Sequence, residues 1–195
     1  MFDPSQVGNL SSSFASPILF TLKKDDVYRM CTHYRALNRV TIKSRYPIPR
    51  TDELIDQLRK ARFFSKIYLR RGYHQTRVVA ADYHKMVFRT RYGSLEYIVM
   101  PFGLTNAPAT FQITMNLIFS SLVDKCVIVY LDNILIYSET REQDLEAVFT
   151  LLHEHRLLTK GSKCEFSKDR LEFLGRVIST KGVELDPRKI ETVQA

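Results

Sequence analysis

The sequence predicts an α+β fold with an extensive sheet. Short apolar segments bounded by turn residues recur along the chain, which is typical of strands in hairpins. Three other segments carry apolar residues at helical spacing. With 195 residues, 45% of them hydrophobic and 26% charged, the chain is long enough to bury a sizeable core in one compact unit.

The first strands are expected after a loop. Residues 1–16 are rich in Ser and other small residues, so they predict a flexible N-terminal segment, with the folded part starting near Pro17. Residues 18–23 and 28–34 then predict a β-hairpin around a polar turn. Residues 51–62 predict a first helix, capped by its initial threonine.

The central part of the chain predicts more strands and a second helix. Strands are expected at residues 63–69, 76–79, 85–89 and 96–100. Asn106 is a suitable N-cap for the helix that follows, whose apolar stripe begins at Phe111. We interpret this stripe as core packing.

Residues 126–137 form the most informative segment, two apolar strands joined by a predicted two-residue turn at Asp132 and Asn133. Both residue types tolerate the positive φ angles that such turns require. A plain core hairpin is the simplest explanation. However, a carboxylate inside an apolar hairpin needs a partner or a metal ion.

The last part of the chain predicts a third helix over residues 141–157, with Phe149 facing inward, and two strands at 163–166 and 171–179. Asp186 followed by proline is a helix start. A helix is therefore expected to begin as the chain ends, with further chain expected after Ala195.

Charge and cysteine content narrow the class of protein. A net charge of +8 favours acidic partners, nucleic acid first, although solubility alone also explains it. The three cysteines lack the spacing of a zinc site and are interpreted as reduced thiols. Without a signal-like N-terminus or a long apolar run, we expect an intracellular protein, cytoplasmic or nuclear, that is neither secreted nor bound to a membrane.

The string Tyr130-Leu131-Asp132-Asn133 resembles the Tyr-x-Asp-Asp signature of reverse transcriptases, with Asn in the last position. Surrounding strings resemble, in family order, blocks of the gypsy-type LTR-retrotransposon enzymes, among them Tyr34-Arg35-Ala36-Leu37-Asn38, Phe64-Ser65-Lys66-Ile67 and Met100-Pro101-Phe102-Gly103-Leu104. The resemblance covers residues 15–193. It implies a right-hand polymerase fold, with fingers and an antiparallel palm sheet backed by helices over residues 17–185, and residues 186–195 as the truncated start of a missing thumb.

The resemblance also implies a damaged metal site. The family holds two divalent cations, Mg²⁺ or Mn²⁺, with three aspartates, and here Tyr68 and Asn133 stand at two of those positions. Asp132 is the surviving carboxylate and the remaining metal ligand. A phenol is neutral at pH 7 and an amide adds no charge, so neither offsets the charge of a bound cation. We expect metal binding to be weak or lost and the chain to be catalytically inactive.

Other positions match the family's contacts with its substrates. Lys23 and Arg29 match residues that contact the incoming dNTP, although a solvated hairpin also explains them. Tyr73 matches the aromatic under the sugar, and Phe102 lies in the block that closes over the nucleotide. The expected contacts with a primer–template or RNA/DNA hybrid are Gln112, which is otherwise a surface amide, and the hairpin residues Phe173, Leu174 and Gly175.

Three functions are compatible with the sequence. The first is a retrotransposon-derived reverse transcriptase domain, an RNA-directed DNA polymerase by descent, that has lost catalysis. The second is a polymerase that is active only as part of a larger polyprotein. The third is a non-catalytic nucleic-acid-binding module.

Overall fold

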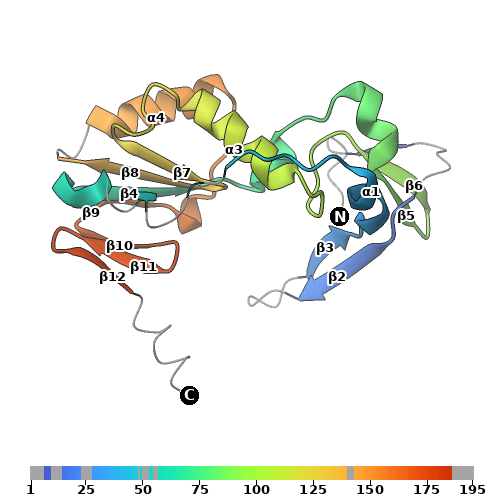
Figure 1. The fold of residues 1–195 in the computed structure, drawn as a ribbon, viewed down its shortest axis with the longest axis horizontal. Helices are drawn as coiled ribbons and strands as arrows, with labels where there is room; N and C mark the ends of the chain where they lie inside the picture. The colour runs from blue at the N-terminus through green and yellow to red at the C-terminus, as the bar shows by residue number, and fades with distance from the viewer. Residues whose placement is uncertain are drawn as a thin grey trace, which may run out of the picture. The chain divides into compact units, whose positions relative to one another are not determined.

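The computed structural model describes residues 7–9, 15–22, 28–47, 49, 53–54, 57–139 and 143–185. The chain divides into two compact units (Figure 1). Unit 1 comprises residues 1–45 and 71–111, and unit 2 comprises residues 46–70 and 112–195. Strands, α-helices and 3₁₀ helices alternate along the described chain, which confirms the predicted α+β class.

A four-stranded antiparallel sheet forms the centre of unit 2, in the order β7-β8-β4-β9. Its strands are β4 (Phe63–Tyr68), β7 (Val127–Tyr130), β8 (Asn133–Ser138) and β9 (Glu165–Lys168). Asn133 pairs with Tyr68 on one side and with Tyr130 on the other. Because directly paired residues lie on the same face of a sheet, these three side chains share one face.

The two faces of this sheet are covered differently (Figure 1). Helix α4 (Gln143–Glu154) lies over one face, above β7 and β8. On the other face lies a small antiparallel sheet of β10 (Arg170–Phe173), β11 (Arg176–Ser179) and β12 (Gly182–Leu185). Residues of both sheets form one core, including Phe64, Leu135, Leu171, Phe173 and Ile178. The face that carries Asn133 is therefore the one that packs against the smaller sheet.

Unit 2 differs from the sequence-based expectation in three places. The predicted strand at 171–179 is a hairpin, because Leu174 and Gly175 adopt φ angles of 51° and 73° and reverse the chain. Phe149 is 44% exposed rather than inward, since its ring meets that of Phe166 at the surface. In the segment of the first predicted helix, the described residues form a 3₁₀ helix, η2 (Gln57–Lys60), after helical residues 53–54.

Unit 1 contains two smaller antiparallel sheets. The first has the order β1-β6-β5, formed by β1 (Val7–Asn9), β5 (Val87–Thr90) and β6 (Gly93–Tyr97). The second is the predicted hairpin of β2 (Ile18–Leu22) and β3 (Tyr28–Thr32), which is confirmed. Buried side chains of Met86, Phe88, Tyr97 and Val99 form the core of this unit.

The short helices of unit 1 and the start of its sheet were not predicted. Helix α1 (Arg35–Val40) follows β3, and the 3₁₀ helices η3 (Gly72–Gln75) and η4 (Ala80–Met86) precede β5. The predicted strand at 76–79 is reduced to a single bridge between Arg77 and Val99. Residues 7–9 pair with β6, so the expectation of a flexible segment is wrong there.

Helix α3 (Ala107–Ile118) begins directly after Asn106, as predicted. The Asn106 side chain accepts a hydrogen bond from Ser44 N at 3.0 Å and donates one to Ile42 O at 2.8 Å, so it anchors the segment after α1 at residues 42–44. A last 3₁₀ helix, η5 (Gly161–Lys163), precedes β9. No helix in the described part of the chain is long and apolar enough to span a membrane. Residues 186–195, the predicted start of a thumb, lie outside the described residues.

Candidate functional site

The three residues of the predicted metal site lie together at one end of the main sheet of unit 2. Tyr68, the last residue of β4, faces Asn133, the first residue of β8. The backbone N–H of Leu69 donates to Asp132 O at 3.0 Å, which holds the turn against the end of β4. All three side chains are half-buried. The structure therefore brings the three predicted residues together, and their role at a metal site remains a prediction.

The turn itself is shifted by one residue from the prediction. Tyr130 pairs with Asn133, so the turn consists of Leu131 and Asp132, and Asn133 already belongs to β8. Leu131 adopts a φ of 52°, a region that bulky residues rarely occupy. Polarity pointed to Asp-Asn as the turn, but both faces of this hairpin are apolar, so alternation could not fix its register.

Gln112 of α3 holds this hairpin from the side. Its side chain is fully buried, and its Nε2 donates to Val129 O at 2.9 Å while its Oε1 accepts from Leu131 N at 2.8 Å. Nε2 also contacts Asn116 Oδ1 at 2.9 Å. The interpretation of Gln112 as a surface amide is wrong, because the amide is occupied inside unit 2, and its contact with nucleic acid remains a prediction.

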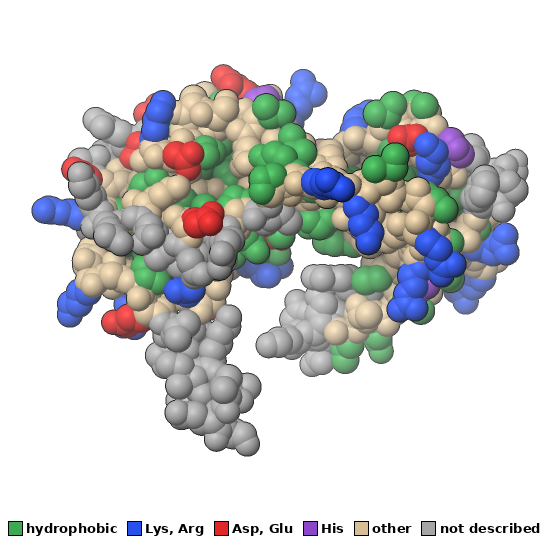
Figure 2. Space-filling view, viewed as in Figure 1, with side chains coloured by type: hydrophobic (Ala, Val, Ile, Leu, Met, Phe, Trp, Pro, Cys, Tyr) green, Lys and Arg blue, Asp and Glu red, His purple; other side chains and the backbone are tan. Residues whose placement is uncertain are grey.

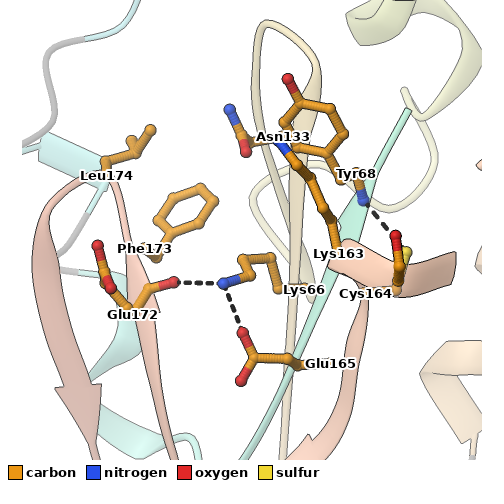
Figure 3. Close-up of a pocket in the computed structure, with 10 residues that line it drawn as sticks. Lys66, Tyr68, Asn133, Lys163, Cys164, Glu165, Glu172, Phe173 and Leu174 are labelled. Atoms are coloured by element: carbon orange, nitrogen blue, oxygen red, sulfur yellow. Dashed lines mark hydrogen bonds and ion pairs between the residues drawn. The ribbon is translucent and has the colours of Figure 1, made fainter. Parts of the chain in front are cut away.

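A pocket of about 430 Å³ opens beside Tyr68 and Asn133 (Figure 3). It lies between β4, the start of β9 and the turn that follows β10, and all of its lining belongs to unit 2. The lining residues are Lys66, Tyr68, Asn133, Ser162, Lys163, Cys164, Glu165, Glu172, Phe173 and Leu174. The candidate site is thus the floor of a cleft that the smaller sheet borders.

Two lysines and two glutamates line this pocket, so its formal charges balance. Lys163 Nζ lies 4.5 Å from the centre of the Tyr68 ring, a cation–π contact. Lys66 Nζ pairs with Glu165 Oε1 at 2.6 Å and donates to Glu172 O at 2.9 Å. Neither contact was predicted from the sequence, although Lys66 and Tyr68 are two residues apart on one strand and must share a face.

The described residues do not fit a site for two divalent cations. Among them, no group of three or more His, Cys, Asp or Glu side chains is placed to hold a metal ion. Asn133 Nδ2 donates to Asp132 Oδ1 at 3.2 Å, so an amide N–H occupies one carboxylate oxygen. At the neighbouring position stands the Tyr68 ring with the ammonium of Lys163 over it. Mg²⁺ prefers oxygen ligands with negative charge, and of the three predicted positions only Asp132 supplies one.

Comparison with known proteins identifies the family. Residues 21–178 match the family model described as reverse transcriptase (RNA-dependent DNA polymerase). The chain belongs to the reverse transcriptase family.

Relatives of this reverse transcriptase domain are polyproteins of LTR retrotransposons. It is 38% identical over 201 residues to the retrovirus-related Pol polyprotein from transposon 297 of Drosophila melanogaster, covering 99% of the chain and 19% of that protein. It is 36% identical over 171 residues to the Transposon Tf2-7 polyprotein of Schizosaccharomyces pombe, covering 86% of the chain and 13% of that protein. The chain thus spans less than a fifth of these relatives, and the gypsy-type assignment is supported.

Solved structures confirm the fold. A foamy viral protease–reverse transcriptase in complex with double-stranded DNA superposes with a TM-score of 0.91 at 22% identity, covering 97% of this chain and 34% of that one. The same enzyme in complex with an RNA/DNA hybrid gives a TM-score of 0.87 at 22% identity over 97% of this chain and 26% of that one. The predicted fingers-and-palm fold is therefore confirmed.

The predicted nucleotide contacts of the reverse transcriptase domain lie in unit 1. The rings of Tyr73 and Phe102 lie 5.0 Å apart, and Phe111 meets Tyr73 at 5.3 Å, so two predicted residues belong to one aromatic cluster. Lys23 lies outside the described residues, and only the backbone of Arg29 is described, paired with Thr21. Their contact with a dNTP remains a prediction.

The aromatic cluster includes a histidine with an altered pKa. His74 lies 5.4 Å from the Phe102 ring and 5.9 Å from the Tyr97 ring. Burial lowers the pKa of His74 to about 4, and the Arg71 guanidinium adds to this shift. His74 is therefore neutral near pH 7 and serves packing.

The residues predicted to grip a primer lie at the pocket. Phe173 and Leu174 line it, and Gly175 completes the turn between β10 and β11. Phe173 is only 4% exposed and belongs to the core of unit 2, whereas Leu174 and Gly175 are half-buried. The accessible part of this hairpin is thus the turn.

Proposed function

We propose that this chain is a retrotransposon reverse transcriptase domain that binds nucleic acid but does not catalyse nucleotidyl transfer by itself. The observation that carries the proposal is the pairing of Tyr68 with Asn133 across β4 and β8. These are the positions at which the family resemblance implies two of three aspartates. Asp132 is left as the single carboxylate of the three.

The physical reason is electrostatic. In the family chemistry, two cations activate the primer hydroxyl and offset the charge of the triphosphate, and carboxylates hold them. Here a neutral amide and a neutral phenol replace two of those charges, and Lys163 adds a positive charge over the phenol ring. Removing one preorganised electrostatic group typically costs about 10²-fold to 10³-fold in rate, so two losses should abolish measurable synthesis.

The test combines metal binding with primer extension. The wild-type chain and the variants Tyr68→Asp, Asn133→Asp and the double variant are titrated with Mn²⁺ by calorimetry or electron paramagnetic resonance. We expect the double variant to bind Mn²⁺ and the wild type to bind no better than Asp132→Asn. Asn133→Asp alone should not restore activity, because the Tyr68 ring still fills the space beside the turn. Templated extension by the wild-type chain would overturn the proposal.

The same design separates the alternative of a polymerase that needs a larger polyprotein. Wild-type and double-variant sites are compared within a longer chain that adds, after Ala195, the segments that follow the matched region in a Pol polyprotein relative. If the longer wild-type protein extends a primer, the site is active and the proposal is wrong. If only the double variant does so, the two substitutions are the cause of inactivity.

Nucleic-acid binding is proposed because the charge is concentrated in unit 1. This unit holds 12 of the 29 Lys and Arg residues but only 5 of the 21 Asp and Glu residues, so it carries +7 of the net charge of +8. Figure 2 shows Lys and Arg side chains gathered over unit 1. Phosphate contacts release counterions, so affinity for a primer–template should fall steeply between about 50 and about 300 mM salt. A flat salt dependence would contradict this part of the proposal.

A further inference from the structure

We propose that the turn between β5 and β6 is a stacking site for unpaired bases, which lets unit 1 bind single-stranded nucleic acid through Tyr92 and Arg91. The inference rests on the nucleic-acid binding proposed above and adds a site and a class of ligand to it. The turn plays no part in the candidate metal site, which belongs to unit 2.

The turn is held rigid by its own hydrogen bonds. Thr90 pairs with Gly93, and residues 91 and 92 form the turn between them. Thr90 Oγ1 donates to Gly93 O at 2.9 Å and accepts from Tyr92 N at 3.1 Å. Below the turn, Phe88 is fully buried in the core of unit 1. A side chain on this turn is therefore presented from a fixed support, which reduces the entropy lost on binding.

The aromatic ring at the apex is accessible. Tyr92 is 83% exposed, and no described aromatic side chain is more exposed. Arg91 Cζ lies 4.6 Å from the centre of the ring, within cation–π range. An exposed ring stabilises nothing by burial in the folded chain, so its apolar surface is open to a flat partner.

The charge around the ring selects a polyanion. Arg89 and Arg91 are both exposed, and neither forms an ion pair with a described carboxylate. Guanidinium groups beside an open aromatic ring provide stacking for a base and a hydrogen-bonding cation for the adjacent phosphate. Neither the exposed ring nor the guanidinium groups alone define a site, but together they match the base and the phosphate of a nucleotide.

The geometry favours an unpaired strand over a duplex. A base can stack on a side chain only when its flat face is exposed, whereas the bases of a duplex are stacked on each other. Such stacking tolerates any base, because every base has a π-face, and the loss on removing one ring is typically about 5-fold to 100-fold in affinity. We therefore expect weak sequence preference and binding to both DNA and RNA single strands.

The absence of tryptophan from the sequence gives a direct test. Tyr92→Trp places a single fluorescent reporter at the turn, and its emission should be quenched by oligo-dT and by oligo-U of about 20 nucleotides. The matched control is Phe166→Trp, at a 43% exposed aromatic position in unit 2, which should not be quenched. Anisotropy of labelled oligonucleotides reports total binding in the same samples.

Substitutions then measure how much Tyr92 and Arg91 contribute to the affinity for single strands. Tyr92→Ala should weaken single-strand binding about tenfold, Tyr92→Phe should stay within about twofold of wild type, and the control Phe166→Ala should change nothing. Blunt duplex binding should change less than about twofold in all of these variants. Arg91→Gln should weaken single-strand binding and lower the salt slope by about one phosphate contact.

The outcomes separate the two proposals. If the chain binds oligonucleotides by anisotropy but the Tyr92→Trp emission is not quenched, the stacking site is wrong and nucleic-acid binding stands. An equal loss on single strands and duplex in Tyr92→Ala would also overturn the stacking site. If no oligonucleotide or duplex binds at all, the proposed nucleic-acid function fails and the stacking site fails with it.

Discussion

Replacing Gln112 with leucine should destabilise unit 2 although the two side chains are similar in size. Strand β7 is at the edge of the main sheet, and its closing pair with β8 is Tyr130 with Asn133. In an antiparallel pair, hydrogen-bonded and non-hydrogen-bonded positions alternate, so Val129 directs its carbonyl away from β8. Gln112 Nε2 is the donor that reaches this carbonyl, at 2.9 Å.

The magnitude follows from the groups that leucine leaves behind. Val129 is 3% exposed, and its carbonyl would lose its partner at a cost of about 1–3 kcal/mol. The N–H of Leu131, in a turn with an unfavourable φ of 52°, would lose its bond to Gln112 Oε1. This second loss is smaller because the bond is only part-buried. Together they predict a destabilisation of about 2–4 kcal/mol.

Urea unfolding followed by circular dichroism measures this difference, with Gln57→Leu as the matched control. Gln57 is exposed; its Nε2 bonds to Asp124 Oδ1 at the surface and its Oε1 accepts a long bond from Tyr137 Oη at 3.4 Å, so its replacement should cost about 1 kcal/mol or less. If Gln112→Leu were as stable as Gln57→Leu, the buried amide would not be what anchors the edge strand. Our account of Gln112 would then be refuted.

Two further predictions concern ionisable side chains that are at least partly buried. Because burial lowers the pKa of His74 to about 4, the unfolded chain takes up a proton near pH 6.5 that the folded chain does not, so stability falls as the pH drops. His74→Phe should reduce the loss between about pH 7 and about pH 4.5 by on the order of 2 kcal/mol, measured by urea unfolding; an unchanged loss would contradict the shift. Lys66→Gln removes the bonds to Glu165 and to Glu172 O and should cost about 1–2 kcal/mol, with faster hydrogen exchange in β10. The control is Lys85→Gln, which breaks an exposed ion pair and should cost less than about 0.5 kcal/mol. If Lys66→Gln cost no more than Lys85→Gln, Lys66 would not join the two sheets.

The parts of the fold that were predicted from sequence depend on local patterns, and the missed strand β1 depends on long-range pairing. The hairpin of β2 and β3, strand β4 and the start of α3 follow from local apolar patterns and caps, and all were found. Strand β1 could not be found this way, because a three-residue strand is ordered only by pairing with β6, far along the chain. The hairpin at 171–179 was missed because Leu174 is not a usual turn residue.

The candidate site was predictable in membership but not in its contacts. Tyr68 and Asn133 were identified by position within recognisable strings, and the sheet pairs them directly. The cation–π contact of Lys163 depends on η5 bringing the chain back beside β4, which no local pattern encodes. The surface-amide interpretation of Gln112 failed because burial of a polar side chain cannot be predicted until its hydrogen-bond partners are known.

The fold of this site does not depend on carboxylates at Tyr68 and Asn133. The turn is fixed by backbone groups, through the bond from Leu69 N to Asp132 O and the bond from Leu131 N to Gln112. No carboxylate takes part in either bond. The Tyr68 ring stands at the end of β4 beside an open pocket, where a larger side chain displaces no core residue. Substitutions at Tyr68 and Asn133 therefore leave intact the bonds that hold the sheet together, so the fold does not require carboxylates at these positions.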